Sequence, residues 1–271
     1  MSRRIAARFA ALAQAGRAGF VAYVMAGDPD LAAATAILQG LPAAGADIIE
    51  LGMPFSDPMA EGPPIQRAAL RALNAGMTMS GVFDLVRHFR HGDQATPIVL
   101  MGYMNPLVSR GLTRFAQDAA EAGVDGLIIV DCPPEEAEPL ADALDAVGID
   151  LIRLATPTTD EARLKVVTAR TGGFVYYVSV TGVTGVKAAD AAAIAPAVAR
   201  VRLASGLPVA VGFGIRTPEA AAEVARVADA VVVGSALVDQ IAAAIAQQRD
   251  PVTKVLETVS ALAQAVRTAR T

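Results

Sequence analysis

The sequence predicts an α/β protein that forms a single (β/α)8 barrel of the TIM-barrel type. Eight short β-branched runs alternate with Ala-rich stretches of helical character, which is typical of βαβ units around a parallel sheet. The chain has 271 residues, which is about the length of a single barrel of this type, and 54% of them are hydrophobic. No stretch rich in Gly, Ser or Pro divides the chain, so we predict one domain over residues 1–271. An open doubly wound sheet is the alternative, but eight strands of similar length favour closure.

The predicted strands are nearly continuous apolar runs, as expected for strands that are buried on both faces. In chain order they cover residues 20–25, 47–51, 98–103, 126–130, 150–154, 174–178, 208–212 and 230–233. Helices are predicted between them, with Asp at several starts and Gly at several ends. They cover residues 30–44, 112–122, 135–147, 160–170, 190–203, 218–227, 235–247 and 251–269. An extra N-terminal helix over residues 3–14 is placed to close the bottom of the barrel.

Two connections are longer than the rest, those that follow the second and the sixth strands. We expect the extra length to lie in the loops at the carboxyl ends of these strands, where barrels of this type carry their active sites. Insertions that merely enlarge a barrel are the alternative. The residues in the two loops favour function.

The composition excludes several classes of protein. The net charge is −4 and no basic cluster occurs, so nucleic-acid binding is not expected. No apolar run reaches the roughly 18 residues that a membrane span needs. Basic residues recur along the amphipathic start of the chain, which is therefore unlike a targeting signal. A single cysteine, Cys132, allows no internal disulfide. We predict a cytoplasmic protein with no membrane partner.

The scarcity of Lys and His limits the chemistry further. None of the three lysines, Lys165, Lys187 and Lys254, lies at the end of a predicted strand, so Schiff-base catalysis is not expected. His88 and His91 are too few for a typical zinc site and are typical of an exposed helix end, so we predict no metal. Cys132 has no base nearby in the pattern and is predicted to be inert.

Glu50 interrupts the otherwise apolar second strand near its carboxyl end. Alternation along the strand places Glu50 on the same side as Ile48, which in a barrel is the interior. A buried carboxylate is costly unless it is paired or used, and burial raises its pKa into the range for proton transfer. A structural Glu that bonds a backbone amide is the alternative, but this position in a barrel favours catalysis.

The loop after the second strand contains two further acids and several prolines. The prolines stiffen the loop, so that it can hold a second carboxylate opposite Glu50. Either Asp57 or Glu61 could be that carboxylate, and their spacing does not choose between them.

Glycines at the ends of the seventh and eighth strands indicate a phosphate site. The segments GFGIR (residues 212–216) and VGSA (residues 233–236) expose backbone amides at these positions. Such amides at a helix N-terminus bind phosphate, and barrels commonly hold one there. Ser235 is also a candidate cap for the helix that follows. The sequence therefore indicates carboxylate acid–base chemistry on a phosphorylated substrate.

The sixth strand and its loop contribute a tyrosine and a candidate lid. Tyr176 and Tyr177 face opposite sides, so at most one of them points into the barrel. The small, glycine-hinged residues 180–185 are typical of a mobile lid, with an ordinary flexible loop as the alternative.

The segment ELGMPFSDPMAEGPPIQ (residues 50–66) resembles the signature of the tryptophan synthase α subunit family. The segments VTGVTG (180–185), GFGI (212–215) and VGSA (233–236) follow in the expected order, and the resemblance spans essentially the whole chain. It implies a lyase that cleaves indole-3-glycerol phosphate to indole and glyceraldehyde 3-phosphate by a retro-aldol reaction. Indole would pass to a PLP-dependent β subunit in an α2β2 heterotetramer, where it joins L-serine to form L-tryptophan. This chain would hold no cofactor itself.

The resemblance also implies a role for each matching residue. Glu50 would be the general acid–base group for indole C3 and the glycerol hydroxyl, Glu61 would bond the indole N–H, and Tyr176 would be the active-site tyrosine. The phosphate would be held by Gly185, Phe213, Gly214, Gly234 and Ser235, with Ile215 nearby. The indole pocket would be lined by Tyr23, Met101, Ile128, Val130 and Leu154. Thr184 would belong to the lid and help to position the second carboxylate. The β subunit would contact Pro54, Phe55, Asp57, Pro58, Asn105 and Pro106.

One residue departs from the family pattern. Glu61 stands in an AEGP context where the family usually has Asp, which preserves the carboxylate but changes how far it reaches.

Two other functions compete with the lyase. Another phosphosugar barrel of the same pathway, such as indole-glycerol-phosphate synthase, would require a lysine at a strand end. A catalytically silent barrel that activates a β subunit is the other.

Overall fold

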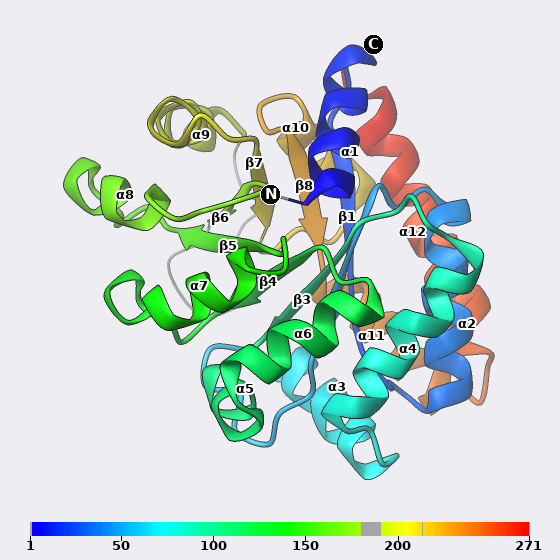
Figure 1. Cartoon of the computed structure of the whole chain (residues 1–271). Coiled ribbons are helices and arrows are strands. Elements are labelled where there is room, and N and C mark those ends of the chain that lie inside the picture. The colour runs from blue at the N-terminus through cyan, green and yellow to red at the C-terminus, as the bar shows by residue number, and fades with distance from the viewer. Residues whose placement is uncertain (1, 180–190, 213, 271) are drawn as a thin grey trace.

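The computed structural model describes residues 2–179, 191–212 and 214–270. Eight parallel strands form a closed barrel in the order β1-β2-β3-β4-β5-β6-β7-β8, and helices surround it (Figure 1). The predicted (β/α)8 barrel is confirmed, and the open sheet is wrong. Among the described residues, no helix is long and apolar enough to cross a membrane.

The strands agree with their predicted ranges to within one residue at either end. Their bounds are β1 Gly19–Met25, β2 Ile48–Gly52, β3 Ile98–Gly102, β4 Gly126–Ile129, β5 Asp150–Ala155, β6 Val175–Val178, β7 Val209–Gly212 and β8 Ala230–Val233. Nearly all of their side chains are buried, because one face packs on the helices and the other fills the barrel.

The helices that were predicted form close to their expected ranges. They are α1 Arg3–Gln14, α2 Leu31–Ala44, α6 Leu112–Ala122, α7 Glu138–Asp145, α8 Glu161–Thr168, α9 Ala191–Ser205, α10 Pro218–Ala225, α11 Ser235–Ala246 and α12 Pro251–Thr268. The prediction of one continuous helix over residues 135–147 is wrong. A 3-10 turn, η1 (Pro134–Glu136), precedes α7, which starts afresh with Pro139 in its first turn.

Three further helices, α3 Pro63–Asn74, α4 Met79–Gly92 and α5 Met104–Arg110, occupy connections for which no helix was predicted. The long connection after β2 is therefore a short loop, residues 53–62, followed by two helices. Pro63 and Pro64 begin α3 rather than extend the loop, because proline is tolerated in the first turn of a helix. Thr78 caps α4 by accepting a hydrogen bond from the Gly81 N–H at 3.1 Å.

Helix α1 closes the bottom of the barrel, as predicted. Its buried residues Ile5, Phe9 and Leu12 pack into one cluster with side chains of the barrel interior. The ring of Phe9 lies 5.6 Å from that of Phe174, measured between centroids. The interior is therefore filled from below, and only its carboxyl-terminal end is left for a site.

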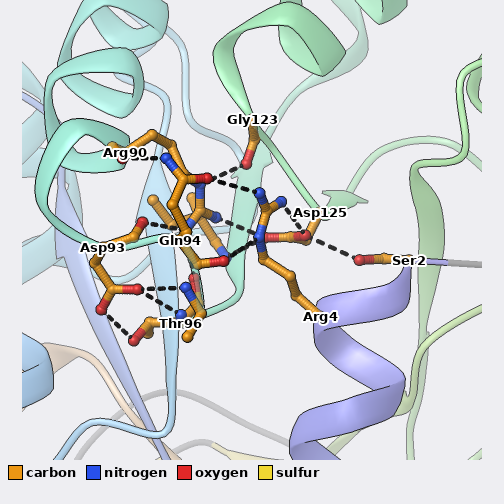
Figure 2. Close-up of polar contacts among 10 residues, drawn as sticks. Ser2, Arg4, Arg90, Asp93, Gln94, Thr96, Gly123 and Asp125 are labelled. Carbon is orange, nitrogen blue, oxygen red and sulfur yellow. Dashed lines mark hydrogen bonds and ion pairs between the residues drawn. The ribbon is translucent and has the colours of Figure 1, made fainter.

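Three aspartates fasten the amino-terminal ends of neighbouring strands. They are the residues just before β2, β4 and β8, namely Asp47, Asp125 and Asp229. Each carboxylate accepts a hydrogen bond from a backbone N–H near the start of the strand before it in the barrel. The three donors are the N–H groups of Phe20, Ile98 and Val209. Asp125 is the centre of the largest of these networks (Figure 2). It accepts hydrogen bonds from the Ser2 hydroxyl at 2.9 Å, Arg4 at 3.1 Å and Arg90 at 2.7 Å. The network ties α1 and α4 to the bottom of the barrel.

Candidate active site

Glu50 points into the barrel near its open end. It is paired in register with Tyr23 of β1 and Val99 of β3, and its exposed fraction is 1%. One of its carboxylate oxygens, Oε2, is buried and makes no hydrogen bond to any described residue. A buried carboxylate oxygen without a partner is costly, so this arrangement within the described residues favours a functional role for Glu50 over a structural one.

The loop over residues 53–62 brings Glu61, and not Asp57, toward Glu50. Asp57 is exposed and accepts a hydrogen bond from the Ser56 hydroxyl at 2.5 Å. Glu61 is partly buried, and its charge acts on Glu50. The path of the loop therefore favours Glu61 over Asp57 as the second carboxylate, a role that stays a prediction.

Two side chains outside the loop hold it in place. The amide of Gln66 in α3 donates to the Glu61 carbonyl oxygen at 2.9 Å, and the Ala60 N–H donates to the Tyr103 hydroxyl at 3.0 Å. The ring of Phe55 also packs on Tyr103, with centroids 5.4 Å apart. The backbone of residues 60 and 61 is thus anchored at two points, which restrains the position of Glu61.

Burial makes both glutamates weak acids. Desolvation, with a smaller contribution from the charge of Glu61, raises the pKa of Glu50 from 4.5 to about 8. Desolvation raises the pKa of Glu61 from 4.5 to about 7. Two acids that share a site titrate as a coupled pair, so near pH 7.5 the pair holds about one proton and one negative charge. A site with one acid and one base at neutral pH can move a proton in both directions.

These raised pKa values predict that wild type loses stability with rising pH relative to Glu50→Gln. A carboxyl whose folded pKa exceeds its unfolded pKa contributes stability below the unfolded value and loses it as pH rises through the folded value. Between pH 6 and pH 9 the wild type should lose about 2 kcal/mol relative to Glu50→Gln, which cannot ionise. Melting temperatures of both proteins at the two pH values test this. Equal pH dependence would show that Glu50 titrates normally.

Two tyrosines flank Glu50 inside the barrel, and a glycine makes room for each. A methyl group built on Gly52 would lie 2.3 Å from the Tyr23 hydroxyl oxygen, and one on Gly212 would lie 2.3 Å from that of Tyr176. Tyr176 joins the interior cluster, whereas Tyr177 packs among the helices, so one of the pair faces inward as predicted. The pKa of both inward tyrosines is well above 10, first because of burial and then because of the two glutamates.

The residues expected to form the indole pocket lie around the same space. Ile128 is fully buried in the barrel interior, and Met101, Val130 and Leu154 are partly buried against that interior. Met101 pairs in register with Gly52 and Ile128, and Leu154 pairs with Tyr176. Together with Tyr23 they form an apolar wall at the carboxyl ends of the strands, next to the two acids.

The expected phosphate site is described in part. Gly214 has a φ of +76°, which favours glycine, and Ile215 beside it is buried. Gly234 precedes α11, whose first N–H groups, those of Ser235 and Ala236, have no acceptor within the helix. The prediction that Ser235 caps α11 is wrong, since Ser235 is the first helical residue and Gly234 holds the cap position without a side-chain bond. Thr184, Gly185 and Phe213 lie outside the described residues, as do Lys187 and the candidate lid.

The described residues that were considered for metal, thiol or amine chemistry do not form a site for any of them. His88 and His91 are exposed on α4, and no group of His, Cys, Asp or Glu suited to a metal occurs among the described residues. Burial raises the pKa of the Cys132 thiol, which keeps it protonated. Lys165 and Lys254 are exposed on α8 and α12.

The residues expected to contact a partner lie together at the open end of the barrel. Pro54, Phe55 and Pro58 are partly buried and Asp57 is exposed in the loop after β2, while Asn105 and Pro106 lie in α5. The contact between Phe55 and Tyr103 joins the two segments. Two apolar side chains that the sequence reasoning missed extend this surface, Met59 and Val108, which are 81% and 59% exposed. Exposed apolar groups at one rim are typical of an interaction surface.

Sequence reasoning also missed Tyr103, Gln66 and Gly52. Alternation from Met101 would have placed Tyr103 on the inner side of β3, and so provides a signal for it. Gln66 and Gly52 offer none, because their roles depend on the path of the loop and on the tilt of the Tyr23 ring.

Comparisons with known proteins agree over nearly the whole chain. The family model described as tryptophan synthase alpha chain matches residues 9–267. The tryptophan synthase alpha chain of Phenylobacterium zucineum is 74% identical over 98% of this chain and 96% of its own length. That of Caulobacter vibrioides is 69% identical over 98% of this chain and 97% of its own length.

Solved structures give the same result. Tryptophan synthase subunit alpha from Legionella pneumophila has a TM-score of 0.91 and 40% identity, covering 98% of both chains. A tryptophan synthase chain of Mycobacterium tuberculosis has a TM-score of 0.88 and 34% identity, covering 98% of this chain and 99% of that one. This chain therefore belongs to the tryptophan synthase alpha chain family and is a lyase subunit of tryptophan synthase.

Proposed function

We propose that Glu50 and Glu61 together carry out the retro-aldol cleavage of indole-3-glycerol phosphate to indole and glyceraldehyde 3-phosphate. The observation that carries this proposal is the pair of glutamates at the open end of the barrel, of which Glu50 is buried and Glu61 is partly buried, with pKa values raised to about 8 and about 7. At neutral pH this pair offers a proton on Glu50 and a negative charge on Glu61, which are the two requirements of the reaction.

The reaction begins with transfer of the Glu50 proton to C3 of the indole ring, which gives a positively charged indolenine. The carboxylate of Glu61 accepts a hydrogen bond from the ring N–H and stabilises that charge. Glu50, now ionised, removes the proton of the glycerol hydroxyl next to C3. The carbon–carbon bond breaks, its electron pair returns to the ring as neutral indole, and the hydroxyl carbon becomes the aldehyde. Glu50 ends with its proton restored, so the cycle is balanced without a metal or an organic cofactor in this chain.

The remainder of the site orients the substrate. The apolar wall of Tyr23, Met101, Ile128, Val130 and Leu154 holds the indole ring, and Tyr176 lies beside Leu154 on the next strand. The amides at Gly214, Gly234 and Ser235, with Ile215 nearby, hold the phosphate at the positive end of α11. Gly185 and Phe213 complete the phosphate site, and Thr184 serves the lid. Fixing the remote phosphate lowers the entropic part of the barrier.

The partner proposed for this chain is the PLP-dependent β subunit, in an α2β2 heterotetramer. The surface of Pro54, Phe55, Asp57, Pro58, Asn105 and Pro106 would contact it, with Met59 and Val108 added by their exposure. Because this surface borders the site that releases indole, the product would pass directly to the partner. The single domain over residues 1–271 and the cytoplasmic location stay predictions from the sequence.

Release of indole from indole-3-glycerol phosphate by the purified chain, with and without a β subunit, tests the proposed function. We expect indole in both cases and faster release with the β subunit. A chain that releases no indole in either case, yet raises the rate at which the β subunit joins indole to L-serine, would be the catalytically silent activator.

A further inference from the structure

Tyr103 lies at the junction between the two halves of the surface proposed for the partner. One half is the loop over residues 53–62 and the other is α5, and Tyr103 is the residue between β3 and α5. Its ring contacts that of Phe55, with centroids 5.4 Å apart. Its hydroxyl accepts a hydrogen bond from the Ala60 N–H at 3.0 Å. A single side chain therefore touches the loop at two points, one on the partner surface and one next to Glu61.

Tyr103 is itself fixed to the barrel. The residue is buried, with an exposed fraction of 3%. The Met104 N–H, at the start of α5, donates a hydrogen bond to a carboxylate oxygen of Asp131 at 2.8 Å. Asp131 directly follows Val130, which belongs to the expected indole wall. The start of α5 is thus held against the end of β4, and Tyr103 gives the loop a fixed point of attachment.

The loop itself is held more loosely than the residues around it. Residues 54–62 are all partly or largely exposed. Besides Tyr103, the Gln66 amide holds the loop through a hydrogen bond to the Glu61 carbonyl oxygen at 2.9 Å. A segment with little buried area and an exposed backbone opens at a low cost in free energy. The position of Glu61 therefore depends on whether these few contacts are made.

Contact with a partner would order the loop from its exposed side. A ligand shifts a population toward the conformation that it binds better, so a partner that covers Phe55 favours its packing on Tyr103. A hydrogen bond made by a segment that is already ordered costs less entropy, so the same contact favours the bond between Ala60 and Tyr103. Glu61 directly follows Ala60 in the chain. The order imposed at Phe55 thus reaches the second carboxylate through one side chain.

We propose that Tyr103 is a positioning residue through which contact of the partner with Phe55 fixes Glu61 beside Glu50. This inference rests on the proposed function, in which Glu61 stabilises the charge on the indole ring and the partner binds this surface. It gives a physical route by which partner binding speeds indole release, and the route needs no contact between the partner and either carboxylate.

The variant Tyr103→Phe tests the inference, because it removes the acceptor of the Ala60 N–H and keeps the ring that packs on Phe55. The measured quantity is the activation ratio, which is kcat for indole release with saturating β subunit divided by kcat without it. We expect this ratio to fall about fivefold, which corresponds to the loss of one hydrogen bond. A purely structural role would lower both values equally and leave the ratio unchanged. Tyr177→Phe is the matched control, since Tyr177 is also buried but packs among the helices, and its ratio should equal that of wild type.

A second measurement requires no turnover. Hydrogen exchange followed by mass spectrometry reports on the backbone amides of residues 60–62 in the isolated chain and in the complex. Addition of the β subunit should slow this exchange in wild type and in Tyr177→Phe, and should slow it about fivefold less in Tyr103→Phe. An equal slowing in wild type and Tyr103→Phe, or an unchanged activation ratio, would overturn the inference. Absence of indole from wild type would overturn the proposed function instead, and the exchange would still decide the role of Tyr103.

Discussion

The variant Glu50→Gln is expected to release indole about 1,000-fold more slowly than wild type. Glutamine fills the same volume but can neither give a proton to indole C3 nor take one from the glycerol hydroxyl, and a positioned acid–base group contributes about 100- to 10,000-fold. The loss should fall on kcat, because the apolar wall and the phosphate site still bind the substrate. Steady-state assays of indole release with the β subunit present measure it.

A matched control is Glu121→Gln, which changes the same atoms on the exposed face of α6 and should retain full activity. A second control is the stability of Glu50→Gln, which should equal or exceed that of wild type above pH 7 because the substitution removes a buried charge. If Glu50→Gln is slow but as stable as wild type, the defect lies in the chemical step and not in folding. Turnover of Glu50→Gln at the rate of wild type would remove Glu50 from the mechanism, whatever the activity of the chain.

The strands could be predicted from the sequence because their physical signal is local. A run such as FVAYVM has no polar face, and only a strand buried on both sides accommodates it. Helix α3 was missed although it carries a comparable signal, with Ile65, Ala68 and Ala72 buried at helical spacing. Its initial prolines resemble a continuation of the proline-rich loop, and only the structure shows that they occupy the first turn.

The same difference between local and non-local signals decides which site residues could be predicted. Glu50 could be predicted because alternation along a strand fixes the direction of its side chain. The choice between Asp57 and Glu61 could not, because the path of a loop depends on contacts with Gln66 and Tyr103, which lie in other elements. The match of residues 50–66 to the family pattern selected Glu61, and the geometry of the loop gives the physical reason for that selection.

The variant Asp125→Ala is expected to be the most damaging single change outside the site. Arg90 is only 6% exposed in its side chain, and Asp125 is its only carboxylate ion-pair partner within the described residues. Removal of one member of a buried ion pair costs about 3–5 kcal/mol, since it leaves the other charge buried. The substitution also removes the acceptor of Ser2, Arg4 and the Ile98 N–H. For a domain of this size the melting temperature should fall by about 10 °C.

Two comparisons separate the buried charge from the other contacts of Asp125. Asp84→Ala breaks an exposed ion pair with Arg87 on the same helix and should change the melting temperature little, because such pairs are screened by solvent. Adding Arg90→Met to Asp125→Ala removes the unpaired charge, but it also removes the bonds that Arg90 donates to the carbonyl oxygens of Gly123 and Thr96 at 2.9 and 2.7 Å. We expect the double variant to recover part of the loss, because a buried unpaired charge costs more than such bonds contribute. A double variant that is more stable than Asp125→Ala would show that the unpaired charge of Arg90 costs more than its carbonyl bonds contribute, and a less stable one would show the reverse (Figure 2).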